Sequence, residues 1–155
     1  MRILVLSDSH GDTASLRMAI ESEKNADAVV FLGDGLNDFD SVKDIIRAKQ
    51  IIAVAGNCDS RFTAYPDITS DRFGNTLIYC THGFREGVKT GLDKLKAIAR
   101  ASECTVALFG HTHTPYTSYE DGLYLMNPGS VRQNSCGIVD ITEKGIICFN
   151  KKISV

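Results

Sequence analysis

The sequence predicts an α/β fold, in which buried strands alternate with amphipathic helices before the chain ends in a strand-rich segment. Short apolar runs bounded by Gly, Asp or Asn recur along the chain, and such runs are typical of buried strands. Stretches with helical spacing follow several of these runs, whereas the last two runs have no helical stretch between them. This order predicts a sheet built from βαβ units and joined to a more antiparallel β layer.

The expected strands share a short apolar segment that ends in a polar turn. They are residues 3–6, 28–32, 51–55, 76–80, 105–109 and 123–126. Two further runs, 137–141 and 145–155, are separated only by Thr142-Glu143-Lys144, so we expect them to form an antiparallel hairpin.

Three helices are expected, at residues 13–24, 39–49 and 87–101. The third has the clearest pattern, because its apolar residues from Val88 to Ala99 keep helical spacing while its lysines take the opposite face. Asp12 precedes the first helix and is expected to be its N-cap.

The composition fits a single globular domain spanning residues 1–155. Hydrophobic residues make up 43% of the chain and charged residues 23%, which is ordinary for a globular domain. The formal net charge is only -2. We therefore expect no extended nucleic-acid surface and no attraction to an anionic membrane.

Cysteine usage and hydropathy predict a cytoplasmic protein. The five cysteines are widely spaced, without a C-x-x-C pair, as expected in a reducing compartment. The apolar run near Met1 is too short for a signal peptide, and no segment approaches the ~18 apolar residues of a membrane span. The edge of the expected strand 145–155 could pair with another chain, which leaves a homo-oligomer open.

The polar turns after the expected strands hold the residues that can carry chemistry. All four histidines lie in these turns, together with two aspartates and an asparagine. The carboxyl ends of parallel strands meet at one edge of a sheet, so these turns can face one site. Nitrogen and oxygen ligands without a thiolate cluster suit Mn, Fe, Zn or Ni. The candidate metal ligands are Asp8, His10, Asp34, Asn57, His82, His111 and His113.

The spacing of these candidates favours two metal ions. In Asp8-x-His10 and His111-x-His113, an extended strand end would put both side chains of a pair on one face. Seven ligands exceed what one ion would use, but they suit two ions about 3.5–4 Å apart. Asp34 is the best candidate to bridge them. Helix capping remains the alternative role for the aspartates, and a turn role for Asn57.

Five ordered motifs resemble those of the calcineurin-like metallophosphoesterases, in particular the small bacterial and archaeal phosphodiesterases of the YfcE type. The motifs are Asp8-x-His10, Gly33-Asp34, Gly56-Asn57, His82-Gly83 and Gly110-His111-x-His113. The resemblance covers about residues 3 to 150 and implies a β-sandwich of mixed sheets flanked by helices.

The resemblance also implies a reaction and a division of the ligands. Asp8, His10 and His113 would hold the first metal, Asn57, His82 and His111 the second, and Asp34 would bridge them. A hydroxide held between two divalent ions, Mn first and otherwise Ni, Zn, Fe or Mg, would attack the phosphorus of a small phosphodiester in line. Two alternatives remain: a phosphomonoesterase at the same site, and a non-catalytic scaffold of the retromer-subunit type.

Two positions depart from the family pattern at the expected substrate edge. Cys58 stands where larger members of the superfamily have a histidine, so a strong proton donor is missing. We place it with Asn57 and His82 in the expected catalytic set, as a weak donor at most, and expect Asp59 to hold the turn. Phe84 stands where many small relatives have a second histidine, so Arg61 or Arg85 could supply the phosphate contact instead.

Overall fold

The computed structural model describes residues 1–154 and contains two five-stranded sheets. The first sheet consists of β1 (Arg2–Leu6), β2 (Ala28–Phe31), β3 (Gln50–Ala53), β9 (Ser135–Thr142) and β10 (Gly145–Lys152). The second consists of β4 (Ile68–Phe73), β5 (Thr76–Thr81), β6 (Val106–Leu108), β7 (Tyr116–Glu120) and β8 (Leu123–Asn127). The helices are α1 (Thr13–Ser22), α2 (Leu36–Ser41) and α3 (Asp93–Ala101), with 3-10 turns at Lys43–Ile46 and Val131–Gln133.

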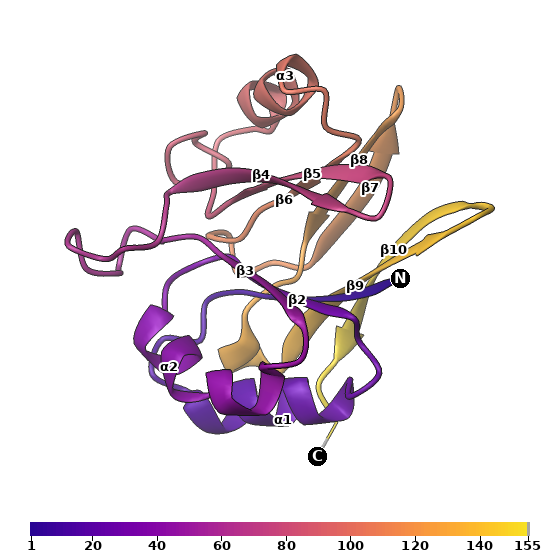
Figure 1. Cartoon of the computed structure of the whole chain (residues 1–155). Coiled ribbons are helices and arrows are strands. Elements are labelled where there is room, and N and C mark those ends of the chain that lie inside the picture. Colours follow the sequence, from indigo (N-terminus) through magenta and orange to yellow (C-terminus); the bar gives the residue numbers. More distant parts are fainter. Residues whose placement is uncertain (155) are drawn as a thin grey trace.

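The two sheets stack face to face between helices (Figure 1). The strand orders are β10-β9-β1-β2-β3 and β4-β5-β6-β8-β7. In the first sheet β1, β2 and β3 are parallel, and in the second β5, β6 and β8 are parallel. Both sheets are therefore mixed, which confirms the α/β class and the helix-flanked β-sandwich.

The C-terminal hairpin is placed differently from the sequence expectation. β9 pairs with β1, so the hairpin extends the first sheet and does not belong to a separate antiparallel layer. The physical reason is that β9 is apolar on both faces: Ile138 packs on the helix side and Val139 packs between the sheets. Of the expected strand 145–155, residue 155 lies outside the described residues.

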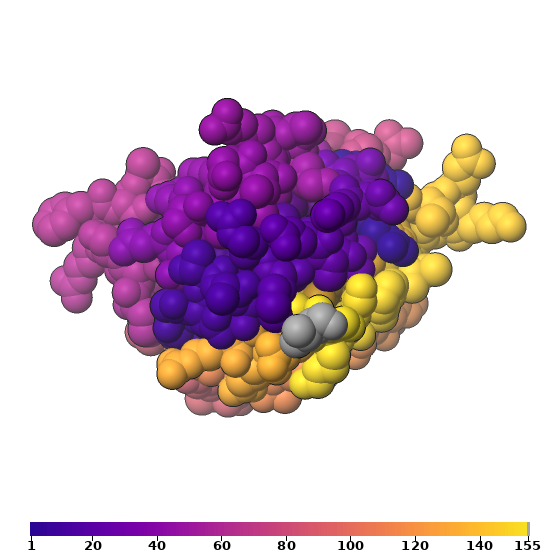
Figure 2. Space-filling view, turned by 90° about the horizontal axis from the view of Figure 1, so that it is seen from below, coloured from indigo at the N-terminus to yellow at the C-terminus, as the bar shows by residue number. Residues whose placement is uncertain are grey.

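The apolar runs of the sequence face two different cores. In β1, Leu4 and Leu6 pack toward α1 and α2, whereas Ile3 and Val5 point between the sheets. A third cluster, with Leu95 of α3, lies on the other face of the second sheet. Figure 2 looks onto the α1 side, where the indigo and purple N-terminal part of the chain covers the centre of the face and the orange and yellow C-terminal part lies along its lower side. Strands buried on both faces have continuous apolar sequences, and this explains why the sequence predicted them.

The helix expected at 39–49 is wrong in its bounds and its type. α2 begins at Leu36 and ends at Ser41, and a 3-10 turn follows at Lys43–Ile46. The Ser41 hydroxyl donates to the carbonyl of Asp38 at 2.6 Å, and such side-chain bonds compete with the helical pattern. Ser22 makes the same contact to Ala19 at the end of α1. At the start of α1, the predicted Asp12 N-cap is confirmed by the bond from the Ser15 N–H.

The helix expected at 87–101 begins only at Asp93. The preceding segment is held as a turn by Glu86, a buried carboxylate that accepts from the Tyr79 hydroxyl at 2.8 Å and from Thr81 Oγ1 at 3.0 Å. Val88 keeps its apolar role by packing on Gly83 outside the helix. Within the described residues, no helix is long and apolar enough to cross a membrane.

Two strands were not predicted from the sequence, β4 and β7. They are the two edges of the second sheet. β4 alternates exposed and half-buried residues, and β7 is exposed along most of its length. An edge strand pairs on one side only and can be polar, so neither has the apolar run by which the central strands were found.

Candidate metal centre

The parallel strands of the two sheets direct their carboxyl ends toward one site, and backbone bonds tie the turns there together. Within the first sheet, the Asp8 N–H donates to Gly33 at 3.0 Å and the His10 N–H donates to Asp34 at 3.1 Å. Across the sheets, the His111 N–H donates to Asp8 Oδ2 at 3.1 Å. Turns that are far apart in the sequence are thus fixed against one another.

Two glycines permit this close approach. A side chain at Gly110 would collide with Ser7 and Asp8, and one at Gly56 would collide with the Asp34 carboxylate. Both positions therefore need glycine for space, because the backbone of one turn lies against the side chains of another.

Asp8, His10 and His113 form the first ligand group. His113 Nε2 lies 3.2 Å from Asp8 Oδ1, and His10 Nε2 lies 3.6 Å from the same oxygen. The two imidazole Nε2 atoms are 3.2 Å apart. Asp8 is fully buried, and its Oδ2 accepts from the Ser7 hydroxyl at 2.6 Å, so the carboxylate is held with Oδ1 facing both histidines.

Asp34, His82 and His111 form the second ligand group. His82 Nε2 lies 3.3 Å from Asp34 Oδ2, and both side chains are about 3% exposed. His82 Nδ1 lies 2.7 Å from the carbonyl of Leu32, which fixes that nitrogen as the N–H and leaves Nε2 as an acceptor. Asp34 Oδ2 also lies 3.8 Å from His10 Nε2 of the first group, so Asp34 stands between the two groups.

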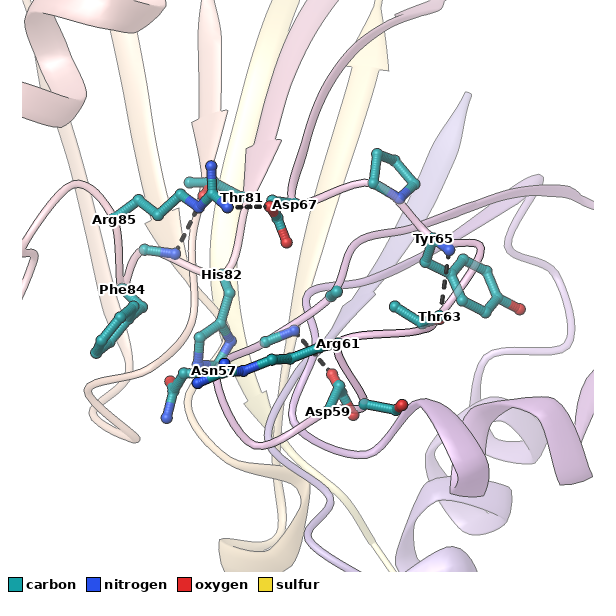
Figure 3. Close-up of a pocket in the computed structure, with 15 residues that line it drawn as sticks. Asn57, Asp59, Arg61, Thr63, Tyr65, Asp67, Thr81, His82, Phe84 and Arg85 are labelled. Carbon is teal, nitrogen blue, oxygen red and sulfur yellow. Dashed lines mark hydrogen bonds and ion pairs between the residues drawn. The ribbon is translucent and has the colours of Figure 1, made fainter.

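Asn57 and Cys58 lie at the exposed rim of this site. Asn57 lines the same cavity as His82 (Figure 3), and its Nδ2 is 3.4 Å from Cys58 Sγ. The Cys58 N–H donates to Asp34 Oδ1 at 2.8 Å. Cys58 Sγ also lies within 4.8 Å of ligand atoms of His10 and Asp34. The thiol is thus close enough to these two residues to share an ion with them, whereas the sequence placed it only at the substrate edge.

Five of the seven predicted ligands adopt a left-handed backbone. Their φ angles fall between 44° and 68°. Side chains other than glycine rarely adopt this conformation, which costs on the order of 1–3 kcal/mol, and such residues cluster at functional sites. The five residues are Asp8, His10, Asp34, His111 and His113. The fold holds these turns in a costly conformation that aims the side chains at one place.

Two buried polar atoms support a bound cation here. Among the described residues, Asp8 Oδ1 and His82 Nε2 are buried and make no hydrogen bond. Leaving a buried donor or acceptor unsatisfied costs about 1–3 kcal/mol. Each of these atoms belongs to one ligand group. A divalent ion in each group would satisfy both, so the residues present fit metal binding.

The charges of the site shift its pKa values in different directions. Burial raises the pKa of Asp34, but the positive charge of a protonated His82 and the hydrogen bond from the Cys58 N–H lower it by more than burial raises it, so the net pKa lies well below its ordinary range. For His82, burial lowers the pKa, but Asp34 and Asp8 raise it above the ordinary value. Burial, followed by the nearby Asp34 carboxylate, raises the pKa of the Cys58 thiol.

Metal should stabilise the protein more at pH 8 than at pH 6. The raised pKa of His82 means that its contribution to the stability of the metal-free chain is fully present below about 6.5 and is lost as the pH rises through the folded value. A cation must displace this proton from Nε2, so its binding strengthens over the same pH range. We expect the difference in Tm between Mn²⁺-loaded and metal-free protein to grow from pH 6 to pH 8, measured by calorimetry. A difference that shrinks would contradict this pKa assignment.

Residues behind the ligands position the turns, and only some were predicted. Asp59 accepts from the N–H groups of Asp34 and Gly56 at 2.8 and 2.7 Å, which agrees with its expected role in the turn. Asp38 was missed: its Oδ2 accepts from the Ser9 hydroxyl at 2.6 Å and from the Gly11 N–H at 2.8 Å. Nothing in the sequence separates Asp38 from an ordinary acidic residue of a surface helix.

The C-terminal half of the site has its own positioning residues in the Asn-Pro-Gly-Ser turn after β8. Asn127 Nδ2 donates to the Gly110 carbonyl at 2.7 Å and to Thr112 Oγ1 at 3.0 Å. Ser130 donates to the carbonyl of Asp8 at 2.7 Å. These contacts hold the turns that carry His111 and Asp8 in place.

Comparison with known proteins identifies the family. The calcineurin-like phosphoesterase superfamily domain matches residues 1–144. Phosphodiesterase YfcE of Escherichia coli K12 is 27% identical, with 97% of this chain and 93% of the relative covered. The crystal structure of a predicted phosphoesterase from Streptococcus pneumoniae TIGR4 has a TM-score of 0.77 at 26% identity, with 97% of each chain covered.

A further solved structure shares the fold. Vacuolar Protein Sorting 29 from Cryptosporidium parvum has a TM-score of 0.75 at 17% identity, with 99% of this chain and 98% of that chain covered. At this identity the likeness concerns the fold alone. The domain match and the ordered motifs confirm the predicted resemblance: the chain belongs to the calcineurin-like phosphoesterase superfamily, a family of metal-dependent hydrolases.

Proposed function

We propose that the protein is a phosphodiesterase that uses two divalent metal ions. The observation that carries this proposal is the pair of adjoining ligand groups, Asp8 with His10 and His113, and Asp34 with His82 and His111. Asp34 reaches toward a histidine of each group, as a bridging carboxylate would. The phosphodiesterase YfcE, with which the chain shares nearly its full length, supports a diester as substrate.

The proposed roles follow from where each side chain lies. When bound, two divalent ions, Mn first and otherwise Ni, Zn, Fe or Mg, would supply the positive charge that activates a water molecule and neutralises the phosphoryl oxygens. The Leu32 carbonyl orients His82, and the Ser7 hydroxyl orients Asp8. Asn57 would complete the ligand set of the second ion. The Cys58 thiol, whose pKa burial raises in the metal-free chain, would be at most a weak donor to the leaving alcohol.

Two other functions are the alternatives. A phosphomonoesterase would use the same groups on a substrate with one more negative charge. A binding scaffold is suggested by the fold of Vacuolar Protein Sorting 29, although a shared fold proves no activity. Buried ligand atoms without hydrogen-bond partners and left-handed backbone at the ligands both destabilise the folded chain. A metal-dependent enzyme needs this arrangement, whereas a scaffold does not, so these features favour the enzyme.

Metal reconstitution tests the proposed function. The protein is stripped of metal, Mn²⁺, Ni²⁺, Zn²⁺ or Mg²⁺ is added back separately, and hydrolysis of bis(4-nitrophenyl) phosphate and of 4-nitrophenyl phosphate is measured. We expect metal-dependent turnover with a higher kcat/KM for the diester. Faster monoester hydrolysis would favour the phosphomonoesterase, and no turnover with any metal would favour the scaffold.

A further inference from the structure

A cavity of about 630 Å³ opens beside the second ligand group. Figure 3 shows it between the loop that follows β3 and the loop that follows β5. Asn57 and His82 both line it, so a phosphoryl group held by the second ligand group would extend one substituent into this space. A volume of this order is typical of small-molecule sites.

The cavity contains two arginines, and their surroundings distinguish them. The Arg85 guanidinium forms an ion pair with Asp67 at 2.5 Å and points away from the ligands (Figure 3). Arg61 is exposed, and among residues 1–154 no carboxylate lies within ion-pair distance of it. Its side chain runs toward Asn57 and His82 in Figure 3. Of the two, Arg61 has a guanidinium available for a phosphoryl oxygen.

Phe84 gives the cavity an exposed aromatic wall. Its side chain is 59% exposed, although it stands directly beside the ligand His111. The two rings meet edge to face, with centroids 5.5 Å apart and planes at 88°. This contact restricts the orientation of the Phe84 ring while most of its surface stays open. An oriented aromatic face in a ligand-sized cavity is suited to stacking on another planar ring.

We propose that this cavity binds a planar aromatic substituent of the substrate against Phe84, while Arg61 contacts the phosphoryl group. The inference deepens the proposed function and rests on it for the position of the phosphoryl group. The substrate class is then a phosphoester of an aryl or nucleobase-bearing alcohol. Arg85 is paired with Asp67 and is therefore not the arginine assigned to the phosphoryl group.

Binding of two phosphonates that differ only in the substituent on phosphorus tests this assignment. Phenylphosphonate and methylphosphonate are titrated calorimetrically into Mn²⁺-loaded protein, in the wild type and in Phe84→Leu, Arg61→Gln and Arg85→Gln. We expect wild-type protein to bind the phenyl compound about tenfold more tightly, and Phe84→Leu, which keeps an apolar side chain, to reduce this preference to about twofold. Arg61→Gln should weaken both ligands about tenfold at an unchanged preference. Arg85→Gln, the matched control, should change neither by more than about twofold.

Each outcome decides one part of the proposal. A wild-type preference below twofold, or one that survives in Phe84→Leu, rules out the aromatic subsite. Equal effects of Arg61→Gln and Arg85→Gln rule out the special role of Arg61. Because binding needs no turnover, the predicted pattern in a protein that hydrolyses nothing would refute the proposed function alone. Hydrolysis without any preference would refute the subsite alone.

Discussion

Replacing Asp34 by asparagine is expected to lower kcat/KM for a phosphodiester by about a thousandfold or more, since even the partners behind metal ligands are worth about 10–100-fold. Asp34 stands between the two ligand groups and is 3% exposed. Asparagine keeps the shape and one acceptor oxygen for the Cys58 N–H, but its amide nitrogen cannot ligate a cation. The change therefore removes the bridging carboxylate with little change in packing.

The loss should appear in metal binding as well as in activity. Equilibrium dialysis with Mn²⁺ should find fewer bound ions per chain in Asp34→Asn, and the metal-dependent rise in Tm should shrink. At a free Mn²⁺ concentration of 100 times the Kd, one metal site stabilises the folded state by about 2.7 kcal/mol. The loss of such a site is large enough to detect. Asn57→Ala and His111→Ala should also remove most of the activity.

Cys104→Ser is the matched control for these substitutions. Cys104 is buried in the cluster beneath α3 and belongs to none of the ligand groups formed by residues 1–154, so its replacement should leave activity and metal content nearly intact. If Asp34→Asn keeps the wild-type metal content and the wild-type metal-dependent rise in Tm while Cys104→Ser loses them, the metal site does not lie at Asp34.

The sequence could indicate six of the candidate ligands that the structure brings together, because the relevant signal is local. Six of the seven candidates follow a strand that is buried on both faces, and the apolar run marks that strand. Asn57 follows β3, a half-buried edge strand. In Asp8-x-His10 and His111-x-His113, a single turn after the strand then supplies two side chains to the ligand groups. The left-handed backbone at these residues could not be predicted, because contacts between turns that are far apart in the sequence hold it.

The features that sequence reasoning missed depend on contacts between distant segments. Asp38 lies 27 residues from Gly11, whose N–H it accepts. The late start of α3 depends on Glu86 finding the hydroxyls of Tyr79 and Thr81. The choice between Arg61 and Arg85 depends on Asp67. In each case the residue type permits several roles, and a tertiary partner selects one.

Asp59 shows how one residue behind the ligands can couple stability to metal binding, and Asp59→Ala should reduce both. The Asp59 carboxylate accepts four backbone N–H groups at 2.7–2.9 Å, those of Asp34, Gly35, Leu36 and Gly56. Alanine leaves all four without this acceptor. An unsatisfied buried donor costs about 1–3 kcal/mol, and water can reach part of this half-buried site, so we expect a loss of about 3 kcal/mol in the free energy of unfolding.

Urea unfolding of the metal-free protein measures that loss, and Asp67→Ala is its matched control. Asp67 is an exposed aspartate of the same loop that forms an ion pair with Arg85, and exposed ion pairs are worth about 0–1 kcal/mol. Asp59→Asn keeps one acceptor oxygen and should fall between the two. Because the same N–H groups fix the turn that carries Asp34, Mn²⁺ affinity should fall in the same order as stability. If Asp59→Ala is no less stable than Asp67→Ala, water satisfies these four groups, and the turn that presents the bridging carboxylate does not depend on Asp59.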